Sequence, residues 1–153
     1  DLTRYPDWTV QVANTPAVIT CTDVMAKEHP ELVVAYMKAM VKVGRWANEH
    51  KRAAAVLLNR QTFYLDPVDT YEGIKHVEMV PSLSAQNMQC IKIGKDFMLS
   101  HGYIKNDFDV DEWAAPEFLE QGVREWLEEE WEKKSWSKLA EGGGLETEGV
   151  RLG

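Results

Sequence analysis

Only two short segments of this 153-residue chain have the pattern of β-strands, and both lie near its beginning. Residues 8–13 alternate apolar and polar side chains, and residues 17–21 are rich in β-branched side chains, with Asn14-Thr15-Pro16 between them. Two short strands leave backbone edges unpaired and form a sheet of marginal stability in water. We therefore expect these strands to pair with β-structure outside this sequence.

The longest helical pattern follows these strands. Pro30 suits the first position of a helix that we expect to end near Glu49. Its polar residues recur at intervals of 7, 4, 3 and 4, which forms one narrow stripe, and apolar residues cover the remaining faces. The stripe consists of Glu31, Lys38, Lys42, Arg45 and Glu49. The pattern therefore predicts a helix that is buried on most of its circumference.

Capping residues and periodicity predict the other helices. Asp66 and Ser84 are typical helix caps, and Gly102 is placed as the left-handed end of a helix. We expect a short helical turn over residues 22–29, helices over residues 53–59, 67–74, 84–100 and 116–139, and a short segment over residues 110–113. The sequence thus predicts an α/β fold dominated by helices, with two short strands and about five helices.

Composition and charge exclude several kinds of partner. The proportions of 44% hydrophobic and 27% charged residues are typical of one globular domain, which at this length needs no disulfide or metal for stability. The net charge of −8 disfavours binding to nucleic-acid phosphates or anionic lipid. No apolar stretch approaches the ~20 residues that span a bilayer. We expect no nucleic-acid partner and no membrane anchor.

The residues that most often carry chemistry are scattered. Cys21 and Cys90 lack the paired spacing of zinc or redox motifs. The histidines also occur singly, at His29, His50, His76 and His101. We therefore predict no metal site and no cofactor, and we interpret Cys21 as a small buried residue because no cationic neighbour in sequence lowers its pKa.

An acidic run in the last predicted helix is interpreted as a solvated face. Carboxylates on successive helical residues point to different sides, so residues 128–130 do not converge on a cation. We expect ordinary pairs one turn apart, Glu129 with Lys133 and Glu130 with Lys134.

Asn14 and Thr15 are the candidate ligand-binding residues. Short polar side chains between two strands can donate amide and hydroxyl hydrogens to a small anion. An ordinary polar turn is the alternative interpretation.

Several stretches resemble the C-terminal part of type II periplasmic binding proteins, in the group that binds sulfonates, nitrate and thiamine precursors. They are His29-Pro30-Glu31-Leu32, Trp46-Ala47-Asn48-Glu49-His50, Leu65-Asp66-Pro67 and Gly102-Tyr103-Ile104. Residues 44–50 and especially residues 111–119, Asp-Glu-Trp-Ala-Ala-Pro-Glu-Phe-Leu, are similar to stretches of the hydroxybiphenyl sulfinate desulfinases.

This resemblance implies a fold of two lobes that close on a small ligand, of which the chain is about half. Residues 1–121 would form the C-terminal part of that fold, residues 122–141 a helical extension and residues 142–153 a flexible tail. The desulfinases carry their cysteine nucleophile, with its histidine and arginine, in the N-terminal half. Neither Cys21 nor Cys90 matches that nucleophile, so the resemblance implies no catalytic residue in this chain.

Three functions remain open at this point. The favoured one is the C-terminal half of a periplasmic solute-binding protein that delivers a small organic anion, such as a sulfonate, to an ABC permease, because this fold mostly hosts binders. The alternative is part of a cytoplasmic desulfinase-like hydrolase that breaks a carbon–sulfur bond. The third is a helical subunit whose Trp-rich last helix binds another protein. We expect the chain to pair with the N-terminal half of the same protein or to self-associate by strand exchange.

Overall fold

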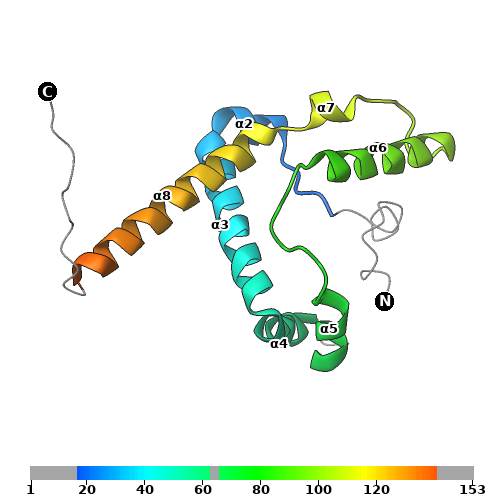
Figure 1. Ribbon diagram of the computed structural model, residues 1–153. Helices are drawn as coiled ribbons and strands as arrows, with labels where there is room; N and C mark the ends of the chain where they lie inside the picture. The colour runs from blue at the N-terminus through cyan, green and yellow to red at the C-terminus, as the bar shows by residue number, and fades with distance from the viewer. Residues whose placement is uncertain (1–16, 63–65, 141–153) are drawn as a thin grey trace, which may run out of the picture.

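The computed structural model describes residues 17–62 and 66–140, and all regular structure in this part of the chain is helical (Figure 1). The helices are α2 (Asp23–Glu28), α3 (Pro30–Glu49), α4 (Lys51–Thr62), α5 (Pro67–Ile74), α6 (Ala85–Ser100), α7 (Val110–Trp113) and α8 (Pro116–Ala140). The predicted α/β fold is therefore wrong for the described residues, which contain no strand.

The two predicted strands have different outcomes. Residues 17–21 have no regular secondary structure, and Val18 and Ile19 are exposed. The reason is that β-branched residues favour a strand only where a neighbouring strand supplies hydrogen bonds and packing, and the described part of the chain offers none. Residues 8–13 lie outside the described residues.

The predicted helices are confirmed, because their signals are local. Asp66 accepts a hydrogen bond from the N–H of Val68 at 2.8 Å, and Ser84 accepts one from the N–H of Asn87 at 3.3 Å, as helix caps do. Gly102 has φ of +74° and ends α6. The N–H of the next residue, Tyr103, donates back to the carbonyl of Met98 at 2.9 Å, which satisfies the end of the helix.

Helix α3 is the centre of the described structure. It packs most extensively against α8 and also contacts α2 and α4, whereas α4 packs against α5, and α6 contacts α7. In Figure 1, α8 begins beside the first turns of α3 and then diverges, so its last turns project away from the other helices. Helix α8 is continuous across residue 121, and the domain boundary placed there stays a prediction.

A glycine allows the close approach of α8 to α3. A Cβ on Gly122 would lie 2.9 Å from the backbone nitrogen of Lys38 and 3.2 Å from the Cβ of Met37. Val34 and Val41, 4% and 1% exposed, lie on the same side of α3 as Met37. The core of the described structure therefore follows this contact.

The other side of α3 is open, which contradicts the prediction of a helix buried on most of its circumference. Its outer face consists of Leu32, Ala35, Tyr36, Ala39, Val43 and Trp46, all of them exposed. The prediction failed because it assumed that the polar stripe faces solvent and the apolar residues face a core. In the structure Lys38 and Lys42 of that stripe face α8 instead.

None of the helices in the described ranges combines the length and the apolar character that crossing a membrane requires.

Candidate functional site

The predicted anion-binding residues, Asn14 and Thr15, lie outside the described residues. Their role in binding a small anion stays a prediction.

The two cysteines lie on different elements and form no disulfide with each other. Cys90 is 2% exposed on α6. Cys21 is exposed in the segment before α2, which corrects the prediction that it is buried. That prediction depended on residues 17–21 forming a covered strand, and no strand forms there.

Three of the four histidines lie at helix ends, and His76 lies in the connection between α5 and α6. His29 precedes α3 and lies 3.6 Å from Glu31, and His50 follows α3 and stacks on Trp46 with ring centroids 5.3 Å apart. His101 follows α6. Across residues 17–62 and 66–140, no three His, Cys, Asp or Glu side chains gather in a way that could hold a metal ion.

Ser100 and His101 form a hydroxyl–imidazole contact that at first resembles a nucleophile with its base. Ser100 Oγ lies 3.1 Å from His101 Nδ1, but that nitrogen also lies 2.9 Å from the carbonyl oxygen of Phe97. Because a carbonyl only accepts, Nδ1 must carry the hydrogen in that contact and is not available to take a proton from Ser100. Ser100 itself donates to the same carbonyl at 3.0 Å. The contact therefore caps α6.

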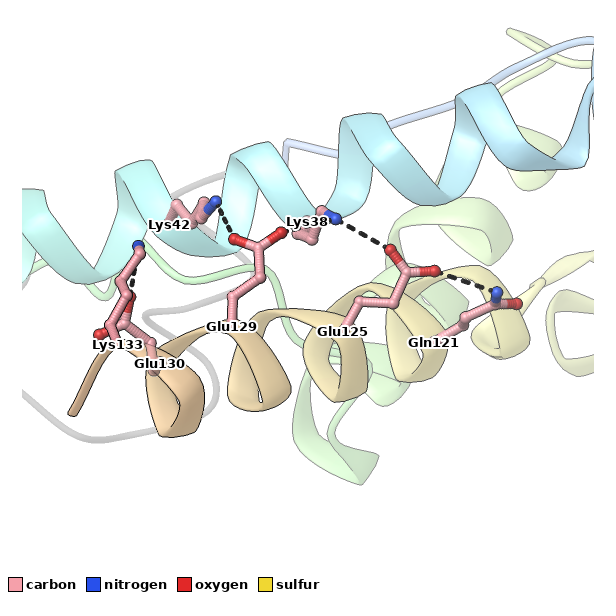
Figure 2. A network of polar contacts seen from close by, with 7 residues as sticks. All are labelled: Lys38, Lys42, Gln121, Glu125, Glu129, Glu130 and Lys133. Carbon is pink, nitrogen blue, oxygen red and sulfur yellow. Dashed lines mark hydrogen bonds and ion pairs between the residues drawn. The ribbon is translucent and has the colours of Figure 1, made fainter. Parts of the chain in front are cut away.

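The most extensive polar network joins α3 to α8 (Figure 2). Lys38 lies between two carboxylates, 3.0 Å from Glu125 and 2.9 Å from Glu129. Lys42, one turn further along α3, contacts Glu129 at 2.5 Å. Gln121 donates to the other oxygen of Glu125 at 3.2 Å. Because higher-numbered residues of one helix meet higher-numbered residues of the other, the two helices run in the same direction through this contact.

These contacts shift the pKa values of the network. The hydrogen bonds from Lys42 and Lys38 lower the pKa of Glu129 from 4.5 to about 2. The hydrogen bond from Lys38, helped by that from Gln121, lowers the pKa of Glu125, and both glutamates in turn raise the pKa of Lys38. Lys38, Glu125 and Glu129 are thus held in their charged forms, so the network suits the joining of helices better than proton transfer.

The acidic run of α8 was predicted to be a solvated face with pairs along the helix, and this is wrong for Glu129. Its partners are Lys38 and Lys42 of α3. Glu130 accepts a hydrogen bond from Lys133 at 3.2 Å, where Lys134 was predicted (Figure 2). One sequence signal was available. Two lysines one turn apart on one helix match two glutamates one turn apart on another, and such pairs can meet when the helices pack side by side.

A second polar cluster fixes the connection between α5 and α6 to the junction of α3 and α4. The side-chain oxygen of Asn48 accepts from the N–H of Met79 at 3.1 Å and from Lys51 Nζ at 2.9 Å. Lys51 also donates to the carbonyl of Val77, and Asn48 donates to Glu78. Burial lowers the pKa of Lys51, although the charge of Glu78 opposes this. Each polar group named here therefore already forms a hydrogen bond that joins two segments of the protein.

Gly44 lies under the same connection. A Cβ at this position would lie 2.8 Å from the carbonyl carbon of Met79 and 2.8 Å from Cα of Val80. Only glycine allows the chain to cross α3 this closely, so the cluster and the glycine together fix the path of the connection.

An open polar hollow of about 500 Å³ lies between α6 and the segment that contains α7. Lys92 contacts Asp111 at 2.6 Å, and Lys95 contacts Asp107 at 2.7 Å and Asp96 at 2.8 Å. The hydrogen bonds from Lys95 and from the N–H of Phe108 lower the pKa of Asp107. Both lysines are paired, and with Asp109 the lining has four aspartates against two lysines, so the hollow carries a net negative charge and does not favour an anionic ligand such as a sulfinate.

The comparisons with known proteins show one distant similarity. The chain is 24% identical over 110 residues to the 2'-hydroxybiphenyl-2-sulfinate desulfinases of Rhodococcus erythropolis and Rhodococcus qingshengii. The desulfinase of Rhodococcus erythropolis strain XP matches equally well. The match covers 70% of this chain and 30% of each relative, so the chain spans about 30% of the length of these relatives. No family model matches the chain, and no solved structure matches it significantly.

The similarity bears on the predictions in two ways. It confirms the resemblance to desulfinases at a coarse level and favours the hydrolase alternative. It gives no support to the favoured prediction of a solute-binding protein with an ABC permease as partner, and the wider resemblance to periplasmic binding proteins stays a prediction. The chain is thus similar to about 30% of a desulfinase, through a part whose described residues form a helical framework.

Proposed function

We propose that this chain is the C-terminal, helical part of a desulfinase-like hydrolase. In this proposal the chain provides a framework, and the catalytic centre is carried by another part of the same polypeptide. The observation that carries the proposal is the match to the Rhodococcus desulfinases over 110 residues. The cytoplasmic location predicted for a desulfinase-like protein belongs to the same proposal.

The proposed reaction is the hydrolysis of a carbon–sulfur bond in an aryl sulfinate. The bond between the ring carbon and sulfur breaks, the carbon takes a proton, and the sulfur leaves as sulfite with the oxygen of one water molecule. Such a reaction needs an activated nucleophile or water next to the sulfur. The polar groups described above are used to join helices, which supports a structural role for this part of the polypeptide.

The test is sulfite release from 2'-hydroxybiphenyl-2-sulfinate, the compound in the relatives' name. Two polypeptides are compared: the 153-residue chain and the product of the whole gene that encodes it. We expect sulfite from the whole-gene product and none from the 153-residue chain. Binding of the sulfinate or a sulfonate by the whole-gene product without sulfite release would overturn the proposal in favour of transport.

A second measurement tests where the nucleophile lies. In the whole-gene product, Cys21→Ser should leave kcat unchanged, because Cys21 is exposed in a segment without regular secondary structure. A complete loss of sulfite release in a folded Cys21→Ser variant would place the nucleophile in this chain and contradict the framework role.

A further inference from the structure

Helix α3 has a second apolar face, on the side opposite α8. Leu32, Tyr36, Ala39, Val43 and Trp46 recur at intervals of 4, 3, 4 and 3, which keeps them on one side along almost the whole helix. With Ala35 they form the outer face defined above, and none of the six side chains is charged.

The exposure of this face is unusual for its composition. Leu32, Tyr36 and Val43 are 54%, 53% and 59% exposed, and Trp46 is 39% exposed. An apolar stripe this wide on a helix normally faces a core. Solvent exposure of all of it in one stable molecule would leave much of the hydrophobic driving force unused.

We propose that the outer face of α3 is the surface on which the rest of a desulfinase-length polypeptide packs. The occupant is an apolar, uncharged layer of the same polypeptide that lies outside these 153 residues. The inference rests on the proposed function only in taking the chain to be part of a longer polypeptide. In the matched relatives, the part similar to this chain is only 30% of the length.

The chemistry of the occupant follows from the face itself. The outer face has no charged group that could pair with a charge on the opposing surface. A charge placed there would lose its water without gaining a partner, which is strongly unfavourable. The opposing layer must therefore be apolar where it meets Leu32, Tyr36 and Val43.

The area of the face argues against a second copy of this chain. A large side chain has an accessible surface of roughly 150–250 Å². Four such side chains, each about half exposed, therefore expose on the order of 400 Å² in total. Stable complexes bury about 800 Å² on each partner. A layer of the same polypeptide does not lose translational and rotational freedom when it packs, so a smaller contact is sufficient.

The test is the reactivity of a cysteine placed in the outer face. Val43→Cys is made in a Cys21→Ser background, and Cys90 is buried. The reaction of Val43→Cys with a maleimide is timed in the 153-residue chain and in the whole-gene product, and peptide mass spectrometry separates labelling at residue 43 from labelling of any other cysteine. The matched control is Val68→Cys on α5, which is 67% exposed and lies outside the outer face.

We expect Val43→Cys in the whole-gene product to react at about one-tenth of its rate in the 153-residue chain, or at a still lower rate, because a packed site reacts only when it opens. The rate measured for Val68→Cys is used to correct for any general difference in thiol reactivity between the two polypeptides. Equal corrected rates at Val43→Cys, or a gene product no longer than this chain, would overturn the proposal. Protection in the 153-residue chain that disappears on dilution would indicate a second copy and would also overturn it.

Labelling requires no catalysis. A whole-gene product that protects Val43→Cys but releases no sulfite would therefore refute the proposed function and leave this inference in place.

Discussion

The contacts of α3 with α8 and of α6 with α7 use the same kind of ion pair and differ in what lies beneath it. Lysines of α3 meet glutamates of α8, and lysines of α6 meet aspartates in and beside α7. The first contact also has a buried row of apolar side chains and a glycine that brings the backbones together. Helices α6 and α7 have only one buried side chain each, Cys90 and Val110.

This difference shows what ion pairs and buried apolar side chains each contribute to a contact between helices. Exposed ion pairs contribute little free energy, because water already solvates both charges, but they favour one arrangement over others. Buried apolar area supplies most of the stability. We therefore expect the α3–α8 contact to depend on its core and the α6–α7 contact to be weak, and the following experiments test this.

The largest effect is expected from Met37→Ala, which removes a buried side chain of α3 that contacts α8 at Gly122. The free energy of unfolding should fall by about 2–5 kcal/mol, because a cavity remains in the contact. The matched control is Met98→Ala on α6, where the side chain is 41% exposed and the loss should be about 1 kcal/mol or less. Urea unfolding of both variants checks this, and similar losses would show that the α3–α8 core is not special.

Two glycine substitutions should have opposite signs. Gly122→Ala places a methyl group 2.9 Å from the backbone nitrogen of Lys38, so we expect a net loss of about 1–2 kcal/mol after the gain in helix propensity is counted. Gly94→Ala on α6 meets nothing within 4 Å and should stabilise the protein by about 0.5–1 kcal/mol. Thermal unfolding of both variants gives the signs, and stabilisation by Gly122→Ala would contradict the close approach.

Acid should weaken the α3–α8 contact through Glu129. Its pKa in the folded protein is lowered from 4.5 to about 2, so its stabilising contribution is present above pH 4.5 and is lost as the pH falls towards 2. The hydrogen-exchange protection factors of α8, which are corrected for the pH dependence of intrinsic exchange, should therefore fall over this range. Glu129→Gln should reduce the pH dependence, whereas Glu128→Gln, exposed and next along the helix, should preserve it. Identical pH profiles for both variants would contradict this role of Glu129.

The smallest effect is expected from Lys92→Met, which removes the 2.6 Å pair with Asp111 between α6 and α7. Both side chains are substantially exposed, so the loss should be about 0.5 kcal/mol or less. A fall in Tm as large as that of Met37→Ala would show that ion pairs, and not burial, hold the α6–α7 contact.

The sequence predicts where the helices lie but not which elements pack against one another. Pro30, Asp66, Ser84 and Gly102 act on the few residues around them, and the structure confirms the helix ends that they predict. The strand over residues 17–21 failed because a strand depends on a neighbour that the local sequence does not specify.

The site could be predicted less well than the fold. The polar stripe of α3 was interpreted as solvent-facing because nothing near Lys38 in sequence indicates that Glu125, 87 positions away, lies beside it. Only the matched one-turn spacing on the two helices carried that information. Asn14 and Thr15 were chosen for their place between two expected strands, and they lie outside the described residues.

The alignment of α3 with α8 is set within the two helices themselves. Lys38 with Glu125 and Lys42 with Glu129 are both separated by 87 positions, and Gly122 lies against the backbone at Lys38. A slide of α8 by one turn would bring Phe118 or Trp126 to a place where only a hydrogen atom fits. An insertion or deletion in the intervening segment, outside the connection that Gly44 and Asn48 hold against α3, would therefore leave this alignment unchanged.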